Sequence, residues 1–344
     1  MDSPSSGGTG RYAMDLYKLF YPDSSIIQLV YNFQNKDEAY SNHIVPNHLH
    51  YPYSAINHLL GKMVFGRHIE KMSGKYSILH IASHRVGPIV ARDESDRLVV
   101  TIHDLFDFKE RRERLGERAF QWMLKRNIRS YSRYRNVIVP SMHVKDDLTN
   151  ILNKVPENIT VIPPFVSDGF VHIDSREKLR EELGLPLDKK LILSVSTDIQ
   201  RKNLKMVALV SEKAGNDFKL VRVGSKVEGS ITFSNVSQEK LNKIYNACDL
   251  LFFPTLDEGF GYPVIEAFKT GLPVVSSNIE VIREIAGDAG ILVDPLSFEE
   301  CIEGIHKAVG NRDYLVRKGY ERAALFSKEK IKEKLLNYYG GICE

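Results

Sequence analysis

The sequence predicts an α/β protein with two domains, each built on a parallel sheet that has helices on both faces. Three observations lead to this fold class. The chain is 344 residues long, enough for about two domains of roughly 100–200 residues each. Short apolar runs alternate with amphipathic segments, which is typical of parallel sheets covered by helices. Several of the runs are apolar at every position, as strands buried on both faces are.

Runs rich in β-branched and aromatic residues predict five strands in each half of the chain. In the first half they lie at 26–31, 78–83, 98–103, 137–140 and 159–162. In the second half they lie at 191–196, 219–223, 250–254, 273–276 and 290–293. Amphipathic segments predict helices at 239–247, 264–270, 298–309 and 327–339.

Two consecutive prolines mark the boundary between the halves. Pro163 and Pro164 stop the strand before them, and a charged helical segment follows. We therefore predict an N-terminal domain at 1–165 and a C-terminal domain at 166–326. The segment 327–344 is expected to be a C-terminal helix that could return to the first domain.

Composition and charge narrow the class of protein. The formal net charge of +3 is small for this length, whereas a dedicated nucleic-acid-binding protein is usually far more basic. The three cysteines lie far apart without metal-ligand spacing, which favours a reducing compartment. No apolar run approaches the length of a membrane span, and the first residues lack the apolar core of a signal peptide. We expect a cytoplasmic protein that binds no nucleic acid and could still lie on a membrane surface.

The most informative stretch is the turn that follows the predicted strand at 250–254. The turn and the helix behind it contain Glu258, Gly259, Phe260, Gly261 and Glu266. Glycines let the backbone approach a ligand closely, and the start of a helix offers free N–H groups to an anion. A carboxylate inside the helix can accept hydrogen bonds from ribose hydroxyls, as acidic residues do in dinucleotide-binding folds. The pattern indicates a nucleotide diphosphate site; the alternative is an ordinary sheet unit with a charged loop and a solvated glutamate.

The same run resembles a known family. The sequence Glu-Gly-Phe-Gly-Tyr-Pro-Val-Ile-Glu, from Glu258 to Glu266, is similar to the signature of retaining GT-B glycosyltransferases. The match is best with glycosyltransferase family 4, the glycosyl transferases group 1, which contains mannosyl- and glucosyltransferases; the stretches 271–278 and 284–295 agree. The resemblance implies two Rossmann-like domains that face each other across a cleft. The C-terminal domain would hold a nucleotide sugar, and the N-terminal domain would hold the acceptor.

The resemblance also implies a reaction. A hexose, with mannose or glucose favoured, would pass from a GDP- or UDP-sugar to a glycan or lipid-linked acceptor, with retention at the anomeric carbon. No metal and no other cofactor is expected, and the sequence contains no Asp-x-Asp motif. The leaving phosphate would help to deprotonate the acceptor, so the carboxylates would bind and stabilise charge instead of acting as the nucleophile and acid of glycosidases.

Two basic residues match the part of the family that binds the donor diphosphate. Lys202 matches a lysine, and Arg201 could replace an arginine that the family carries where this chain has Ser196-Thr197. Cations at this place would offset the charge that develops on the leaving diphosphate. Taken alone, Arg201 and Lys202 could equally be a surface pair at the start of a helix.

Two further matches lie in the first half. His103 ends a predicted strand, and the family carries a histidine there that faces the donor sugar, although many strand-end histidines are structural. Gly8 and Gly10 match a glycine-rich loop that approaches acceptor and diphosphate, although terminal glycine clusters are commonly disordered. No strand-length apolar run precedes this loop, so either residues are missing upstream or the sheet lacks its first strand. The predicted catalytic residues are Glu258, His103 and Lys202. The predicted donor-binding residues are Glu266, Arg201, Lys202, Gly259, Phe260, Gly261, Gly8 and Gly10.

The segment 109–135 is strongly basic, with ten Lys or Arg residues against three Glu. Apolar residues recur in it at helical spacing, so it could contact anionic lipids or could be a solvated helix with an ordinary core-facing stripe. Two other functions remain open at this point. The chain could be a sugar-nucleotide epimerase of the same fold, or a protein that binds a nucleotide sugar without catalysis.

Overall fold

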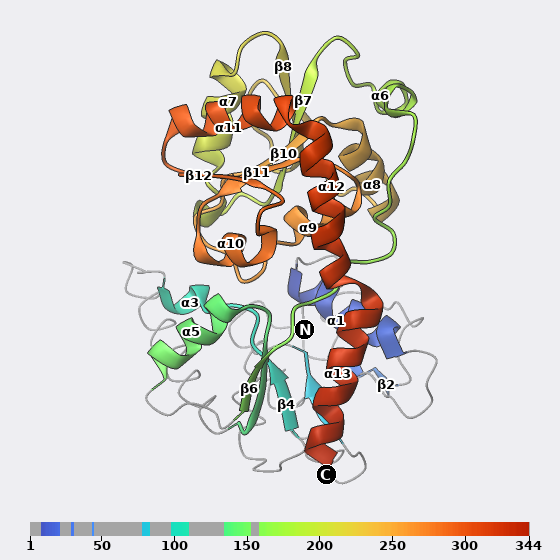
Figure 1. Cartoon of the computed structure of the whole chain (residues 1–344), viewed down its shortest axis with the longest axis vertical. Helices are drawn as coiled ribbons and strands as arrows, with labels where there is room; N and C mark the ends of the chain where they lie inside the picture. The colour runs from blue at the N-terminus through green and yellow to red at the C-terminus, as the bar shows by residue number, and fades with distance from the viewer. Residues whose placement is uncertain are drawn as a thin grey trace, which may run out of the picture. The chain divides into compact units, whose positions relative to one another are not determined.

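The computed structural model describes residues 8–20, 29–30, 43–44, 78–82, 98–109, 134–152 and 158–343. The chain divides into two compact units (Figure 1): one comprises Met1–Pro164 together with Ile331–Glu344, and the other comprises Phe165–Lys330. The predicted α/β class is confirmed, because every pair of neighbouring strands that the structure describes is parallel. No helix in the described part of the chain combines the length and the apolar character that a bilayer crossing requires.

The unit Phe165–Lys330 contains a six-stranded parallel sheet. Its strands, in spatial order, are β12 (Ile291–Val293), β11 (Val274–Ser277), β10 (Leu250–Phe253), β7 (Lys190–Ser196), β8 (Phe218–Gly224) and β9 (Ile231–Phe233). The chain therefore begins at the centre with β7, builds outward to β9, and then returns to the other side of β7 with β10. The connections that leave β7 and β10 diverge at this switch point, and ligands bind in the crevice that such a divergence leaves at the carboxyl ends of the strands.

Alternate residues of the central strands face opposite sides of this sheet. Leu191 and Leu251 belong to a core that includes residues of α8 (Gln238–Ala247), α9 (Tyr262–Lys269) and α10 (Glu280–Ala286). Ile192 and Leu250 belong to a second core, shared with α7 (Leu204–Lys213) and α11 (Phe298–Gly310). Figure 1 shows α7 and α11 together on one side of the strands and α8 with α9 on the other. Burial on both faces explains why these strands are apolar throughout.

Two more helices of this unit border the amino ends of its strands. Helix α6 (Arg176–Leu183) precedes β7, and α12 (Arg312–Ala323) follows α11 and packs against α9. Short 3₁₀ helices, η4 (Gln200–Lys202) and η5 (Ala324–Phe326), precede α7 and α13 (Lys328–Cys343). Gly271, in the connection from α9 to β11, has a φ of 72°, and a Cβ there would collide with the hydroxyl of Tyr320.

The other unit contains a four-stranded parallel sheet. Its strands, in spatial order, are β3 (Leu79–Ile81), β4 (Leu98–Thr101), β5 (Asn136–Val139) and β6 (Asn158–Val161). Two residues each form the parallel pair β1 (Leu29–Val30) and β2 (His43–Ile44). The described helices before α6 are α1 (Gly8–Phe20), α3 (Phe106–Lys109) and α5 (Met142–Ile151). Val144 and Leu148 of α5 pack on Val100 and Val137, which gives this sheet its own core.

Most predicted elements are present, and the differences have physical reasons. The strand predicted at 26–31 is described only as β1, and β2 and β9 were not predicted because two or three residues are too few for a periodic pattern. The glycine-rich loop prediction was wrong for Gly8 and Gly10, which lie in the first turn of α1. Glycine lowers helix propensity but tolerates the first turn, where tertiary contacts of Tyr12 and Ala13 can fix the helix.

Candidate functional site

Two loops that leave the switch point are tied to each other. The loop after β7 contains Arg201, and the loop after β10 contains Thr255 and Leu256. The backbone N–H of Leu256 donates to the Arg201 carbonyl at 2.7 Å, and the Thr255 hydroxyl oxygen lies 3.0 Å from the same carbonyl oxygen. These bonds hold together two segments that are more than fifty residues apart in the sequence.

Glu258 forms ion pairs with both predicted cations, Arg201 and Lys202. One carboxylate oxygen, Oε1, pairs with the Lys202 ammonium and accepts the Thr255 hydroxyl at 2.9 Å. The other oxygen, Oε2, lies 3.2 Å from Nη1 of Arg201. The side chain of Glu258 is 7% exposed, that of Lys202 13% and that of Arg201 23%. Two cations therefore share one largely buried carboxylate at the carboxyl ends of β7 and β10.

The backbone before α7 orients the two cations. The 3₁₀ helix that carries Arg201 and Lys202 ends at Asn203, whose φ of 52° is in the left-handed region. Asparagine adopts this conformation more readily than most residues, and its side-chain amide donates to the Pro295 carbonyl at 2.8 Å. The Lys202 ammonium also lies 5.2 Å from the centre of the Phe253 ring, within cation–π range.

The glycine turn before α9 has the expected special conformation at one residue. Gly261 has a φ of 98°, and a Cβ there would lie 3.1 Å from Cδ1 of Ile282. Helix α9 starts directly after it, with a proline in the first turn. The Phe260 side chain is buried, with ring contacts to Tyr262 and Phe326. Of Phe260 we therefore expect only the backbone amide to reach a ligand, and this part of the site stays a prediction.

Glu266 lies in the second turn of α9 and is 2% exposed. Its Oε2 accepts a hydrogen bond of 2.7 Å from the hydroxyl of Tyr245, a fully buried residue of α8. The bond fixes the orientation of the carboxylate between two helices. The alternative of a solvated glutamate is excluded by this burial, whereas the predicted contact with a ribose stays a prediction.

Arg222 in β8 is a buried cation that sequence reasoning missed. Its guanidinium donates to the Ser196 carbonyl at 2.7 Å, to the Ser194 hydroxyl at 3.0 Å and to the Ser225 carbonyl at 3.2 Å. Burial lowers its pKa to about 10, and the charge of Asp198 acts in the opposite direction. Arg222 thus joins β8 to the end of β7, where the family has a Gly-Arg pair. An arginine between two valines in a predicted strand was the signal that could have revealed it.

His103 follows β4 in the other unit. Its Nε2–H donates to the Ala82 carbonyl at 2.7 Å, and its ring lies 4.7 Å from that of Tyr12 in an edge-to-face contact. The histidine is therefore held by β3 and α1, at the carboxyl ends of β3 and β4. Its role toward a sugar stays a prediction.

His80 in β3 was not predicted from the sequence. Its Nε2 lies 2.7 Å from the Thr101 hydroxyl and its Nδ1 lies 2.5 Å from the Tyr339 hydroxyl. Burial, with a smaller effect of His103, lowers its pKa to about 3. His80 is thus a neutral, structural histidine that joins two strands to α13.

Two predictions fall wholly or partly outside the described residues. Of the basic segment 109–135, only Lys109 and residues 134–135 are described, and Lys109 pairs with Asp147 at 2.5 Å. Gly7 of the glycine-rich stretch is also outside the described part. Among the residues that are described, no three His, Cys, Asp or Glu side chains are placed to hold a metal ion.

Comparison with known families agrees with this geometry. A family model described as "Glycosyl transferases group 1" matches residues 175–324. A second, described as "Glycosyltransferase Family 4", matches residues 6–169. The chain belongs to these GT-B glycosyltransferases. The cluster around Glu258 lies in the part of the chain that matches the group 1 description.

Curated relatives of the chain include two bacterial mannosyltransferases. The chain is 32% identical to O-antigen chain mannosyltransferase B of Escherichia coli, over 36% of this chain and 33% of the relative. It is 28% identical to O-antigen chain mannosyltransferase RfbU of Salmonella typhimurium, over 60% of each chain. The chain thus spans between one third and three fifths of the length of these relatives.

Solved structures share the fold of this chain over nearly its whole length. Sucrose-phosphate synthase from Thermosynechococcus elongatus has a TM-score of 0.79 at 19% identity, covering 98% of this chain and 94% of that one. Anabaena HepE in complex with UDP-glucose has a TM-score of 0.78 at 16% identity, covering 99% and 98%. At such identities the likeness establishes the GT-B fold.

Proposed function

We propose that this protein transfers a hexose, mannose or glucose, from a GDP- or UDP-sugar to a glycan or lipid-linked acceptor, with retention at the anomeric carbon. The observation that carries the proposal is the pairing of Lys202 and Arg201 with Glu258 at the switch point of the sheet. A diphosphate that enters there would meet two cations that one carboxylate holds side by side. The names of the mannosyltransferase relatives support the choice of sugar.

Each group has a distinct task in the proposed reaction. Lys202 and Arg201 stabilise the negative charge that grows on the diphosphate as the bond to the sugar breaks. The first N–H groups of α9, behind Gly261, contribute the partial positive charge of a helix start. Glu258 holds the cations in place before the donor binds, and Glu266 accepts hydrogen bonds from the ribose. His103 orients the sugar, and no metal is required.

Nucleotide binding tests the first half of the proposal. Thermal unfolding of the full chain is measured with UDP, GDP, UDP-glucose and GDP-mannose, each against sodium chloride of equal ionic strength. A donor at about a hundred times its Kd stabilises the folded state by about 2.7 kcal/mol, which raises the Tm by several degrees. If none of the four compounds raises the Tm, the proposed donor site is wrong.

Turnover tests the second half. Release of UDP or GDP is followed with and without a lipid-linked or glycan acceptor, and the product is analysed for its anomeric configuration. An acceptor-dependent release that yields a retained linkage is expected, and Lys202→Met should reduce it at least a hundredfold, because a preorganised charge is worth about 2.7–4 kcal/mol in such sites. Release of an altered free sugar without acceptor would instead indicate an epimerase.

The acceptor side of the proposal includes a membrane surface. A basic segment near anionic lipid gains about 1 kcal/mol per Lys or Arg close to the surface. We expect the chain to sediment with vesicles that contain anionic lipid and to remain in solution with neutral vesicles. Replacing Lys125, Arg126 and Arg129 with glutamine should weaken this binding, and replacing three lysines of α13 should not.

A further inference from the structure

A pocket of about 210 Å³ lies at the other end of the strands from Glu258. Cys248, which comes just before β10, and Leu272, which comes just before β11, both line it. Glu258 comes after β10, so β10 separates this pocket from the proposed donor site. The remaining walls come from residues 172–176, the end of α8, the connection after α9, and Arg312 of α12. The pocket is large enough for several waters, whose share of liquid volume is about 30 Å³ each.

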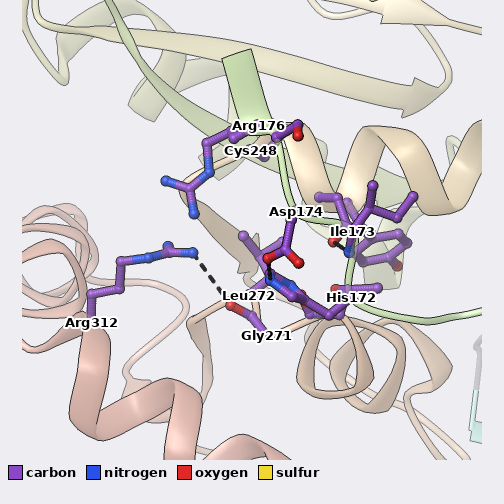
Figure 2. Close-up of a pocket in the computed structure, with 12 residues that line it drawn as sticks. His172, Ile173, Asp174, Arg176, Cys248, Gly271, Leu272 and Arg312 are labelled. Carbon is purple, nitrogen blue, oxygen red and sulfur yellow. Dashed lines mark hydrogen bonds and ion pairs between the residues drawn. The ribbon is translucent and has the colours of Figure 1, made fainter. Parts of the chain in front are cut away.

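Two guanidinium groups face this pocket from different helices. Figure 2 shows the side chains of Arg176, at the start of α6, and Arg312, at the start of α12, extending toward the same space. Nη1 of Arg312 donates to the backbone carbonyl of Asp249 at 2.9 Å, and Nη2 lies 3.4 Å from the Gly271 carbonyl. Among the described residues, no carboxylate lies within ion-pair distance of Arg312.

The charges around the pocket do not balance. Asp249 pairs with Arg176 at 3.1 Å and with Arg180 at 2.7 Å, so one carboxylate serves two guanidiniums. Arg312 is a third. Burial and the like charge of Arg176 lower its pKa, and the charges of Asp249 and Asp313 act in the opposite direction. Such a cluster of partly buried cations is stabilised by an anion that takes the remaining N–H groups, and planar guanidiniums suit the oxygens of a phosphate.

Two polar features at the rim complete the environment. His172 lies 3.1 Å from the Thr270 carbonyl through Nδ1 and 3.2 Å from Asp174 through Nε2. The Asp174 side chain is 99% exposed, so water screens its charge. Ser175, at the start of α6, has a φ of 89° and makes no side-chain cap, which leaves the first N–H groups of that helix without a side-chain oxygen.

We propose that this pocket is a second anion site, which binds a phosphate dianion between Arg176 and Arg312. The phosphate is either free or carried on a small organic molecule, for which the pocket volume leaves room. The site is independent of the proposed donor site, because it uses different residues, which lie at the amino ends of the strands. Bound phosphate would link the start of α6 to the start of α12. Without it, Arg176 and Arg312 share Asp249 as a partner, Arg176 through the carboxylate and Arg312 through the backbone carbonyl.

Thermal unfolding of the full chain tests this proposal. Inorganic phosphate and glycerol 3-phosphate are titrated separately into the wild type and into Arg176→Gln and Arg312→Gln, with sodium chloride at matched ionic strength. We expect at least one compound to raise the wild-type Tm by about 2–4 °C. In both variants this rise should fall to half or less. If only glycerol 3-phosphate raises the Tm, the natural ligand is an organic phosphate. If both compounds raise it, the site binds the free phosphate dianion.

Two matched variants locate the bound anion. Arg317→Gln removes the same charge from an exposed position of α12 and should leave the rise unchanged. Lys202→Gln weakens the proposed donor site and should also leave it unchanged. If the rise survives in Arg312→Gln but disappears in Lys202→Gln, the phosphate binds at the donor site and the proposal is wrong. An absence of any rise in the wild type, or an equal rise in every variant, also overturns it.

Discussion

At the scale of single residues, Glu258 and Glu266 have different surroundings although both are buried in the same unit. Glu258 is held by two cations and a hydroxyl. Glu266 accepts a hydrogen bond from a neutral phenol, Tyr245. A carboxylate that organises cations affects the charge on the leaving group, whereas a bond from a neutral hydroxyl can be exchanged for one from a hydroxyl of the ligand. The two residues should therefore differ in the kinetic step that they influence.

Replacement of each glutamate by alanine tests this difference. Glu266→Ala should raise the Kd of the donor nucleotide by about tenfold or more, the equivalent of one lost hydrogen bond to a charged group. Glu258→Ala should mainly lower kcat and should destabilise the fold by up to about 3 kcal/mol, because it leaves two cations without their carboxylate. Titration calorimetry and steady-state kinetics separate the effects. Unchanged kinetics in both variants would refute the assignment.

Arg222 offers a second prediction at this scale. Arg222→Met removes the donors that hold the carbonyls of Ser196 and Ser225, and each such loss amounts to about 1–3 kcal/mol. We expect a lower urea midpoint and a weaker donor affinity, because the loop with Lys202 follows Ser196. Arg222→Lys should restore little, since one ammonium cannot reach the same set of acceptors. Full affinity in Arg222→Met would show that the end of β7 holds its shape without this residue.

At the scale of elements, the turn between β10 and α9 depends on one glycine. Gly261 has a φ that other residues rarely adopt, and its missing side chain leaves room for Ile282 of α10. Gly261→Ala should thus cost about 1–3 kcal/mol in stability and displace the start of α9 from the donor. Denaturation and donor affinity measure both effects. Gly310→Ala, at a helix end with nothing within 4 Å, is the matched control and should be nearly neutral.

The elements that the sequence predicted well are those with local signals. The segment from β10 to α9 has an apolar strand, a glycine turn and a helix start in one short stretch. This pattern indicated both its structure and its place at the carboxyl ends of the strands. Three-residue β9 was missed because it is short and half-exposed. Helical Gly8 and Gly10 were missed because composition alone suggests a loop.

The two arginine clusters could not be predicted because they depend on contacts between distant parts of the chain. Arg222 and Ser196 lie on neighbouring strands, and Arg176, Asp249 and Arg312 come from three separate parts of the chain. These residues meet only through the tertiary fold. Charge counts along the sequence therefore gave no sign of either cluster.

At the scale of the whole molecule, one buried histidine links the stability of the protein to pH. In the unit with β3, His80 joins Thr101 to Tyr339, which are more than two hundred residues apart in the sequence. Its environment holds the imidazole neutral, with a pKa of about 3 against an ordinary 6.5. Protonation would place an uncompensated charge among buried groups, so it opposes folding.

The sign of the pH dependence follows from these two values. Above about pH 6.5 the histidine is neutral in both states and folding is unaffected. As the pH falls toward 3, the unfolded chain takes up a proton that the folded chain excludes, so His80 lowers stability by about 1.4 kcal/mol per pH unit. His80→Gln keeps a hydrogen-bonding side chain and removes the titration. In urea unfolding between pH 7 and 5, the free energy of unfolding should therefore fall less steeply in the variant, because all other titrating groups are common to both proteins. Parallel curves would contradict the buried neutral state of His80.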